Sequence, residues 1–224
     1  MSWNIQKGIG MDLRRDLDRT VSVLRDADAD VFGLQEVLEH QAELVARALD
    51  SDWAWGPARP RFGNALYVRG EVVEHRVHDL SVPRCEPRAC LEALIAVRDT
   101  RLRVFVCHFG LGFREREIQA ARLRDVLRSA QPDAPRVVFG DFNEWQRRGP
   151  VGRTLTREFP LAPAPLRTHP SPLPIFALDR IAWDPHLVGT VRVAGVKNAS
   201  DHRMLRADLV PEPAPGLAGP PPIR

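Results

Sequence analysis

One short segment near the middle of the chain places the strongest constraint on its fold. Residues 137–139 are an apolar run typical of a buried strand, and Gly140 permits a sharp turn directly after it. Asp141 and Asn143 follow at a spacing of two, so an extended backbone would point both side chains the same way. Gly, Asp and Asn are also ordinary turn residues, and this segment alone favours a simple turn. Its significance comes from similar polar clusters elsewhere in the sequence.

Polar side chains recur where other apolar segments end. Strands are predicted at 2–5, 29–34, 102–107 and 175–183, and a polar loop at 198–202. The side chains at these ends or in the adjoining loops are Asn4, Glu36, His108, Asp141, Asn143, Asp179, Asp201 and His202. Carboxylates and amides suit a hard divalent ion, and histidines exchange protons near neutral pH. The set predicts metal-assisted phosphoester hydrolysis. It suits Zn²⁺ less well, because no Cys/His group has zinc-site spacing.

The remaining segments alternate between helical and extended patterns. Helices are predicted at 13–27, 38–49 and 114–129, with a short helix mixed with loop in 149–174. Strand pairs are predicted for 63–68 with 72–77 and for 91–97 with 102–107, and single strands at 188–196 and 204–209. Strands outnumber helices, and helices separate some of them. We therefore expect an α/β or α+β fold with strands layered against helices.

Composition sets broader limits. The 224 residues are enough for one large domain, and 44% hydrophobic with 27% charged residues is typical of a globular protein. A net charge of +3 is weak evidence for a nucleic-acid partner, and we attribute the excess of Arg over Lys to a GC-rich genome. The three cysteines lack metal-site spacing, and no segment resembles a signal peptide or a membrane span. We expect a cytoplasmic monomer with reduced thiols.

Six blocks in order resemble the endonuclease/exonuclease/phosphatase superfamily, which has the DNase I-like fold. The blocks are Ser2-Trp3-Asn4-Ile5, Leu34-Gln35-Glu36-Val37, Val106-Cys107-His108-Phe109, Gly140-Asp141-Phe142-Asn143, Leu178-Asp179-Arg180-Ile181 and Ser200-Asp201-His202. Each block alone is weak, but six in the right order are specific. The resemblance implies a four-layer sandwich, in which two mixed β-sheets pack face to face with helices on the outer faces. It implies a catalytic domain at 1–210, and we expect a disordered Pro-rich tail at 211–224.

The resemblance also implies a bound Mg²⁺ or Mn²⁺ and a proton acceptor. Glu36 would be the principal metal ligand with Asn4 beside it, and His202 would be the general base. Asp201 would bind the metal or fix His202. Read without the resemblance, Asn4 is an ordinary turn residue, and Glu36 complements the dipole of the helix that follows it. The Asp201–His202 pair has no such structural explanation.

Further catalytic roles follow from the same resemblance. Asp141 and Asn143 would orient the attacking water and stabilise the pentacovalent phosphorus. His108 would contact the phosphate while Asp179 holds its ring, and Glu86 would orient the general base. The alternative reading of His108 is a hydrogen-bonded core histidine at a strand end.

Arginines close to these blocks are candidate phosphate contacts. Arg88 ends the block Arg84-Cys85-Glu86-Pro87-Arg88, which contains Glu86, and Arg114 comes shortly after His108. The Arg-rich face of the helix predicted at 114–129 otherwise reads as a solvated surface. Its apolar stripe includes Ile118, Ala121, Leu123, Val126 and Leu127.

The substrate class stays open at this point. The superfamily cleaves DNA, RNA, inositol phosphates and sphingomyelin, and its shared chemistry does not choose among them. The loops here are short, without a long basic insertion or an exposed apolar hairpin. We place a nuclease-like phosphodiesterase first, a hydrolase of a small-molecule, inositol or lipid phosphoester second, and a non-catalytic scaffold third. Family members usually carry apolar residues before the Trp-Asn-Ile block, whereas this chain begins almost inside that strand. If such residues are missing, Asn4 is less firmly held and one sheet edge is weakened.

Overall fold

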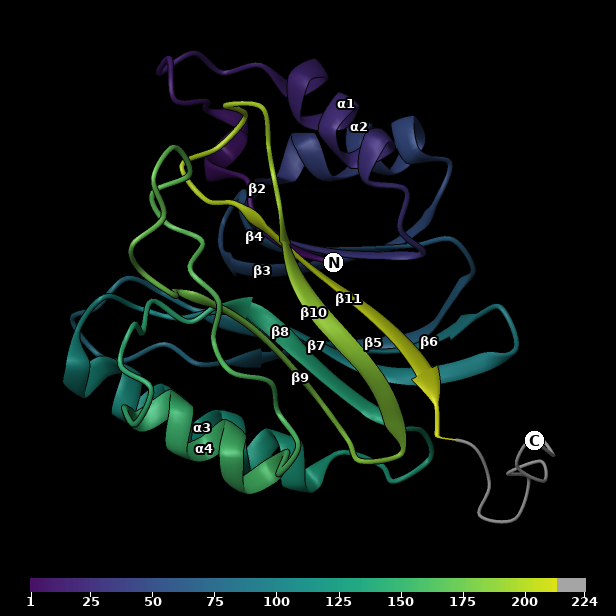
Figure 1. The fold of residues 1–224 in the computed structure, drawn as a ribbon, viewed down its shortest axis with the longest axis vertical. Helices are drawn as coiled ribbons and strands as arrows, with labels where there is room; N and C mark the ends of the chain where they lie inside the picture. Colours follow the sequence, from purple (N-terminus) through teal and green to yellow (C-terminus); the bar gives the residue numbers. More distant parts are fainter. Residues whose placement is uncertain (213–224) are drawn as a thin grey trace, which may run out of the picture.

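Two β-sheets pack face to face in the computed structural model, which describes residues 1–212 (Figure 1). The first has the order β10-β11-β1-β2-β4-β3 and the second β5-β6-β7-β8-β9. The first sheet consists of β1 (Ser2–Asn4), β2 (Val31–Leu38), β3 (Asp52–Arg59), β4 (Phe62–Val68), β10 (Leu187–Ala194) and β11 (Met204–Pro211). The second consists of β5 (Glu71–Asp79), β6 (Ala89–Val97), β7 (Thr100–His108), β8 (Arg136–Asp141) and β9 (Asp179–Trp183). Both sheets are mixed, because β1 runs parallel to β2 and β7 parallel to β8.

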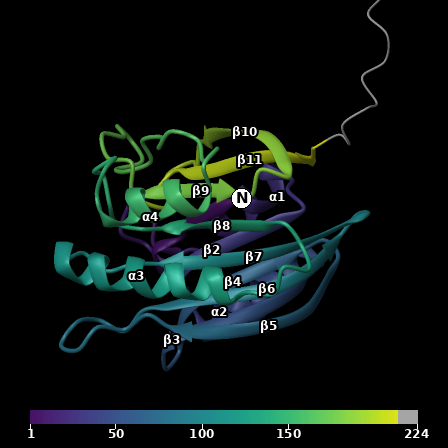
Figure 2. The same ribbon diagram turned by 90° about the horizontal axis from the view of Figure 1, so that it is seen from below.

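Helix pairs cover the outer faces. α1 (Leu17–Ala27) and α2 (Glu39–Leu49) lie on the first sheet, while α3 (Phe113–Ser129) and α4 (Pro150–Glu158) lie on the second (Figure 2). The short 3-10 helix η1 (Gln6–Gly8) follows β1. The predicted four-layer sandwich is therefore confirmed.

Strand alternation sorts the apolar side chains into separate cores. Along β7, Val104 and Val106 pack between the sheets, whereas Phe105 and Cys107 face α3 and α4. The other strands of this sheet alternate in the same way, because successive strand residues point to opposite faces. A side chain that continues the inward alternation past the apolar core therefore ends up between the two sheets.

The helix predicted from residue 13 begins later. Leu13 has φ +61° and is 85% exposed, and α1 begins at Leu17. Asp16 caps it, because its Oδ1 accepts a hydrogen bond of 2.9 Å from the Arg19 amide. A side-chain cap thus decided the boundary rather than the apolar spacing.

Two strand predictions were wrong. The segments 63–68 and 72–77 do not pair, because β4 lies between β2 and β3 in the first sheet while β5 pairs with β6 in the second. All seven residues of β4 are buried, so it is an interior strand. β3 was not predicted at all. The strand predicted at 175–183 begins only at Asp179, and the pair 91–97 with 102–107 is confirmed as β6 and β7.

Helix α3 departs from the predicted division of its faces. Arg116, expected on a solvated surface, is 3% exposed, and Ile118, expected in the apolar stripe, is 42% exposed. Ala120 joins Leu123 and Leu127 in the buried set. The Arg116 guanidinium donates to the Leu111 carbonyl, which allows the charge to be buried beside the chain entering the helix.

The predicted domain boundary and tail lie at the end of the described chain. β11 includes Pro211, one residue past the expected end of the catalytic domain. The rest of the predicted tail, 213–224, lies outside the described residues. Within residues 1–212, none of the helices has the length and apolar character needed to cross a membrane.

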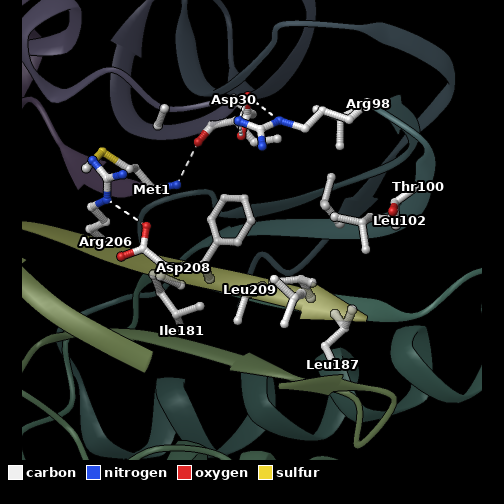
Figure 3. Close-up of a pocket in the computed structure, with 18 of the residues that line it drawn as sticks. Met1, Asp30, Arg98, Thr100, Leu102, Ile181, Leu187, Arg206, Asp208 and Leu209 are labelled. Carbon is white, nitrogen blue, oxygen red and sulfur yellow. Dashed lines mark hydrogen bonds and ion pairs between the residues drawn. The ribbon is translucent and has the colours of Figure 1, made fainter. Parts of the chain in front are cut away.

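A cavity of about 560 Å³ opens between the sheets at the end where β1 begins (Figure 3). Ser2 pairs with Gly33 and Leu205, so β2 and β11 continue past Met1 with no described strand between them. The Met1 amino group donates to the Val31 carbonyl at 2.6 Å, and burial lowers its pKa to about 5. β1 is therefore a short central strand, not the weak sheet edge suggested by the sequence.

We expect this cavity to accept a longer β1. Four residues added before Met1, apolar where they point between the sheets, would hydrogen-bond to β2 and β11 and fill the cavity. Melting followed by circular dichroism should show a Tm higher by several degrees, the shift that about 1 kcal/mol gives a domain of this size. A Gly-Ser extension of equal length is the control, and an equal Tm for both extensions would contradict this interpretation.

Candidate active site

Four predicted side chains converge because their strands end at the same edge of the sandwich. Asn4 ends β1, His108 ends β7, Asp141 ends β8 and Asp179 begins the antiparallel β9. On β8 the inward-facing set is Val137, Phe139 and then Asp141, so the carboxylate continues the apolar row. All four residues are buried. The site therefore lies between the two sheets, at the end opposite the cavity beside Met1.

Glu36 reaches the cluster through a break in strand regularity. The register of β2 against β4 shifts between Leu34 and Val37, and Glu36 has φ +55°. A bulge of this kind re-aims one side chain without ending the strand. The Glu36 carboxylate then receives the Asn4 amide at 3.3 Å and lies 3.4 Å from the Lys7 ammonium.

One carboxylate oxygen is the centre of the cluster. Asp141 Oδ2 accepts a hydrogen bond of 2.9 Å from Asn4 Nδ2 and lies 3.7 Å from Nε2 of both His108 and His202. Its other oxygen accepts from the Asn143 backbone amide at 2.9 Å. Burial, and then the charge of Asp179, raise the pKa of Asp141 to about 6, against the opposing effect of His202.

His202 is oriented by Asp179, which corrects one expected pairing. Asp179 Oδ2 lies 2.9 Å from His202 Nδ1, so Asp179 holds this ring and not that of His108. The same oxygen accepts from the Thr168 hydroxyl at 2.5 Å. His202 Nε2 is thereby turned toward Asp141. Burial alone would lower the pKa of His202, but the charges of Asp179 and Asp141 outweigh it and raise the pKa to about 10.

His108 is held by an arginine, which corrects a second pairing. Arg88 Nη1 lies 3.5 Å from His108 Nδ1, and Arg88 Nη2 lies 2.9 Å from Glu86. Glu86 also pairs with Arg59 at 2.9 Å, so it supports Arg88 and does not orient the general base. Burial, and then the charge of Arg88, hold the pKa of His108 well below its usual value. His108 is therefore a neutral ring whose Nε2 faces Asp141.

The other predicted residues differ in their placement. Asn143 lies at the cluster with φ +51°, and its amide donates to the Phe109 carbonyl at 2.9 Å. The Asp201 carboxylate lies 3.6 Å from His169, accepts from the Ser200 hydroxyl at 3.3 Å, and groups with His169 and His202. Arg114 is an exposed residue in the first turn of α3. The expected metal set of Glu36, Asn4 and Asp201 is therefore divided.

Three residues at the site were not predicted. Lys7 lies beside Glu36, Thr168 bonds to Asp179, and the His169 ring centroid is 4.8 Å from that of His202. Thr168 and His169 belong to a loop in which residue spacing carries no signal. Lys7 is one of only two lysines in the sequence, and it lies two residues after the first block.

Oxygen ligands at this edge suit a hard divalent ion. The Asn4 amide nitrogen stands between the carboxylates of Glu36 and Asp141, and the Lys7 ammonium faces Glu36 from another side. These amide and ammonium groups lie beside the two carboxylates, where a bound cation would neutralise the same negative charge. Among the described residues, Asp141–Asp179–His202 and His169–Asp201–His202 also have ligand atoms within 4.8 Å of one another. The residues fit Mg²⁺ or Mn²⁺.

The four-layer sandwich, with buried carboxylates and imidazoles at one edge, places this protein in the class with the DNase I-like fold. The sequence model of the Endonuclease/Exonuclease/phosphatase family matches residues 1–202, and the chain belongs to that family. Its members are generally phosphoester hydrolases. The resemblance found in the sequence blocks is thereby confirmed.

Individual proteins resemble this chain in sequence or in fold. The protein YbhP of Escherichia coli K12, described as uncharacterized, is 30% identical over 205 residues, covering 80% of this chain and 81% of its own. A conserved Enterococcus faecalis protein of unknown function has a similar structure, with TM-score 0.79, 17% identity and coverage of 94% and 98%. The mannosyl-6-phosphatase Bt3783 of Bacteroides thetaiotaomicron gives TM-score 0.73, 18% identity and coverage of 93% and 98%. D. rerio TDP2 complexed with single-strand DNA product has a TM-score of 0.73 and 18% identity, covering 93% of this chain and 97% of its own.

The His202 ring should stay protonated in EDTA well above pH 7. Because its pKa of about 10 exceeds the ordinary value of about 6.5, its stabilising contribution is complete below pH 6.5 and is lost as the pH rises to 10. Titration by ¹⁵N NMR should show the high pKa, and Asp179→Asn should lower it by about one unit or more. Asp201→Asn is the matched control, and it should lower the pKa of His202 by less than Asp179→Asn does. A wild-type pKa near 6.5 would contradict the arrangement.

Proposed function

We propose that this protein is a Mg²⁺- or Mn²⁺-dependent phosphoester hydrolase, with nuclease-like phosphodiester cleavage as its reaction. The observation that carries the proposal is the arrangement around Asp141 Oδ2, where strands of both sheets and the loop before β11 bring together an amide, a second carboxylate and two imidazoles. An acid–base pair beside an oxygen-rich cation site is what phosphoester hydrolysis requires. A silent scaffold would be expected to have lost at least one of these groups.

Glu36 and Asn4 would hold the cation beside Asp141. When bound, the ion would polarise a phosphoryl oxygen, and its charge would oppose that of the His202 imidazolium and lower the pKa of that ring. His202 Nε2 then accepts the proton of the attacking water, while Asp179 holds Nδ1 and stabilises the charge that forms. Asn143 supports the Asp141 carboxylate through its backbone amide.

His108 would serve as a neutral hydrogen-bond donor to the phosphate. The Arg88 guanidinium donates to Nδ1, so the ring proton belongs on Nε2, which faces the cluster. A donor that is already in place stabilises charge developing on the phosphoryl oxygens without reorganisation. Arg88 is buried, so we now assign it to positioning His108, and Arg114, which is exposed at the start of α3, remains a candidate phosphate contact.

The alternative substrate is a small-molecule, inositol or lipid phosphoester. The solved relatives include a mannosyl-6-phosphatase and a protein bound to single-strand DNA product, so both substrate classes occur on this fold. We keep nuclease-like cleavage first, because a solved protein with this fold is complexed with single-strand DNA product.

Removal of the principal ligand or the general base should abolish activity without unfolding the protein. Glu36→Ala and His202→Ala should each lower plasmid nicking and bis-p-nitrophenyl phosphate hydrolysis in Mg²⁺ by about 10²-fold or more. EDTA should have the same effect on the wild type. Exposed Glu117→Ala and His75→Ala are the matched controls. Full activity in either site variant, with a native circular dichroism spectrum, would refute the assignment. Hydrolysis of the small diester without nicking would favour the alternative substrates.

Arg88→Met should lower kcat more than it raises KM. The His108 ring would lose the group that fixes its tautomer, whereas the cation site stays intact. We expect a loss in kcat of about tenfold or more. Arg76→Met on exposed β5 is the control. A variant with unchanged kcat and a higher KM would instead identify Arg88 as a direct phosphate-binding residue.

A further inference from the structure

A row of four rings leads from the catalytic imidazole to the surface. The His202 and His169 centroids are 4.8 Å apart, those of His169 and Phe176 6.5 Å, and those of Phe176 and Trp145 5.8 Å. Exposure rises along the row, from buried His202 to 39% for Phe176 and 53% for Trp145. We call these four residues the ring row. It leads from the reacting centre to two exposed apolar rings, Phe176 and Trp145.

The hairpin that carries two of these rings is firmly held. Its backbone pairs through Thr168 N to Phe176 O and Phe176 N to His169 O, both at 2.8 Å. Ser171 N donates to the Asp201 carbonyl at 2.7 Å, and Arg203 Nε donates to the Ser171 carbonyl at 2.7 Å. The hairpin is thus attached to the same loop that holds His202, so the rings keep their position relative to the catalytic centre.

Trp145 is supported from inside the protein. It lies two residues after Asn143, and Arg180 fixes the preceding backbone by donating to the Glu144 carbonyl at 2.7 Å. The buried Arg116 guanidinium lies 5.6 Å from the indole centroid. Arg116 therefore braces the indole ring and is not free to bind phosphate. An indole that is held this way and is still half exposed is pre-organised for a ligand.

We infer that the ring row binds the planar aromatic group of a phosphoester, such as the base of a nucleotide or the ring of an aryl phosphate. This inference rests on the proposed function and names its substrate class. A base stacks on aromatic side chains without regard to sequence, so the row would select for a ring and not for one base. The basic side chains lie apart from the ring row, in ion pairs: Lys7 pairs with Glu36, and Arg59 and Arg88 pair with Glu86. The ring row would thus recognise the aromatic ring, and the part of the site that holds the basic side chains would recognise the phosphate.

The test compares two phosphates that differ only by a base. In Mg²⁺, wild-type protein should bind AMP about tenfold more tightly than ribose 5-phosphate in calorimetric titration, the scale of one base–aromatic stack. Trp145→Ala and Phe176→Ala should bring this ratio close to one without changing ribose 5-phosphate binding. Ile175→Ala is the matched control, because Ile175 is also 53% exposed on the same hairpin but carries no ring. Equal binding of both phosphates by the wild type, or an unchanged ratio in Trp145→Ala, would overturn the inference.

A second experiment distinguishes a nucleic-acid substrate from a small ester. It also distinguishes failure of the ring inference from failure of the proposed function. Cleavage rates are compared for oligothymidylate and for the same backbone with tetrahydrofuran in place of every nucleoside. Preference for the base-bearing strand that Trp145→Ala abolishes supports a nucleic-acid source, and a preference confined to AMP supports a small ester. Equal cleavage of both strands together with equal AMP and ribose 5-phosphate binding overturns the ring inference and leaves the hydrolase intact. No cleavage of any diester refutes the proposed function itself.

Discussion

The buried carboxylate of Asp141 is the interaction on which the site depends. Its Oδ2 meets an amide from one sheet, an imidazole from the other and a second imidazole from a loop. A carboxylate this deeply buried is tolerated only because hydrogen-bond donors and positive charge surround it. The same requirement explains why Asp179 must hold His202 in place, since a ring free to rotate would leave Asp141 without part of its compensation.

Strand alternation made much of the centre predictable. His108, Asp141 and Asp179 stand where an inward-facing row changes between apolar and polar residues, and this pattern is visible in the sequence. The order of the six blocks along the chain also revealed the family. The four-layer arrangement then followed from the resemblance and not from periodicity.

What could not be predicted depends on distances between strands and on local backbone irregularity. Two histidines and three carboxylates allow several pairings, and only the placement of β9 beside β8 gives Asp179 to His202. Glu36 enters the cluster through a bulge with φ +55°, which no alternation pattern contains. The predicted pairing of 63–68 with 72–77 was wrong, because a short connection suggests a hairpin. In the structure this connection carries the chain from one sheet to the other.

The contacts that close the site join the two ends of the described chain. The Ser200 hydroxyl donates to the Asn4 carbonyl across 196 residues, and the Trp3 indole donates to the His202 carbonyl across 199. Contacts so distant in sequence form only after nearly all of the chain has been ordered. During synthesis, Asn4 of β1 and Glu36 of β2 leave the ribosome long before His202 does. A growing or truncated chain therefore carries an incomplete cluster, and any chemistry that depends on all of these side chains arrives only with the finished fold.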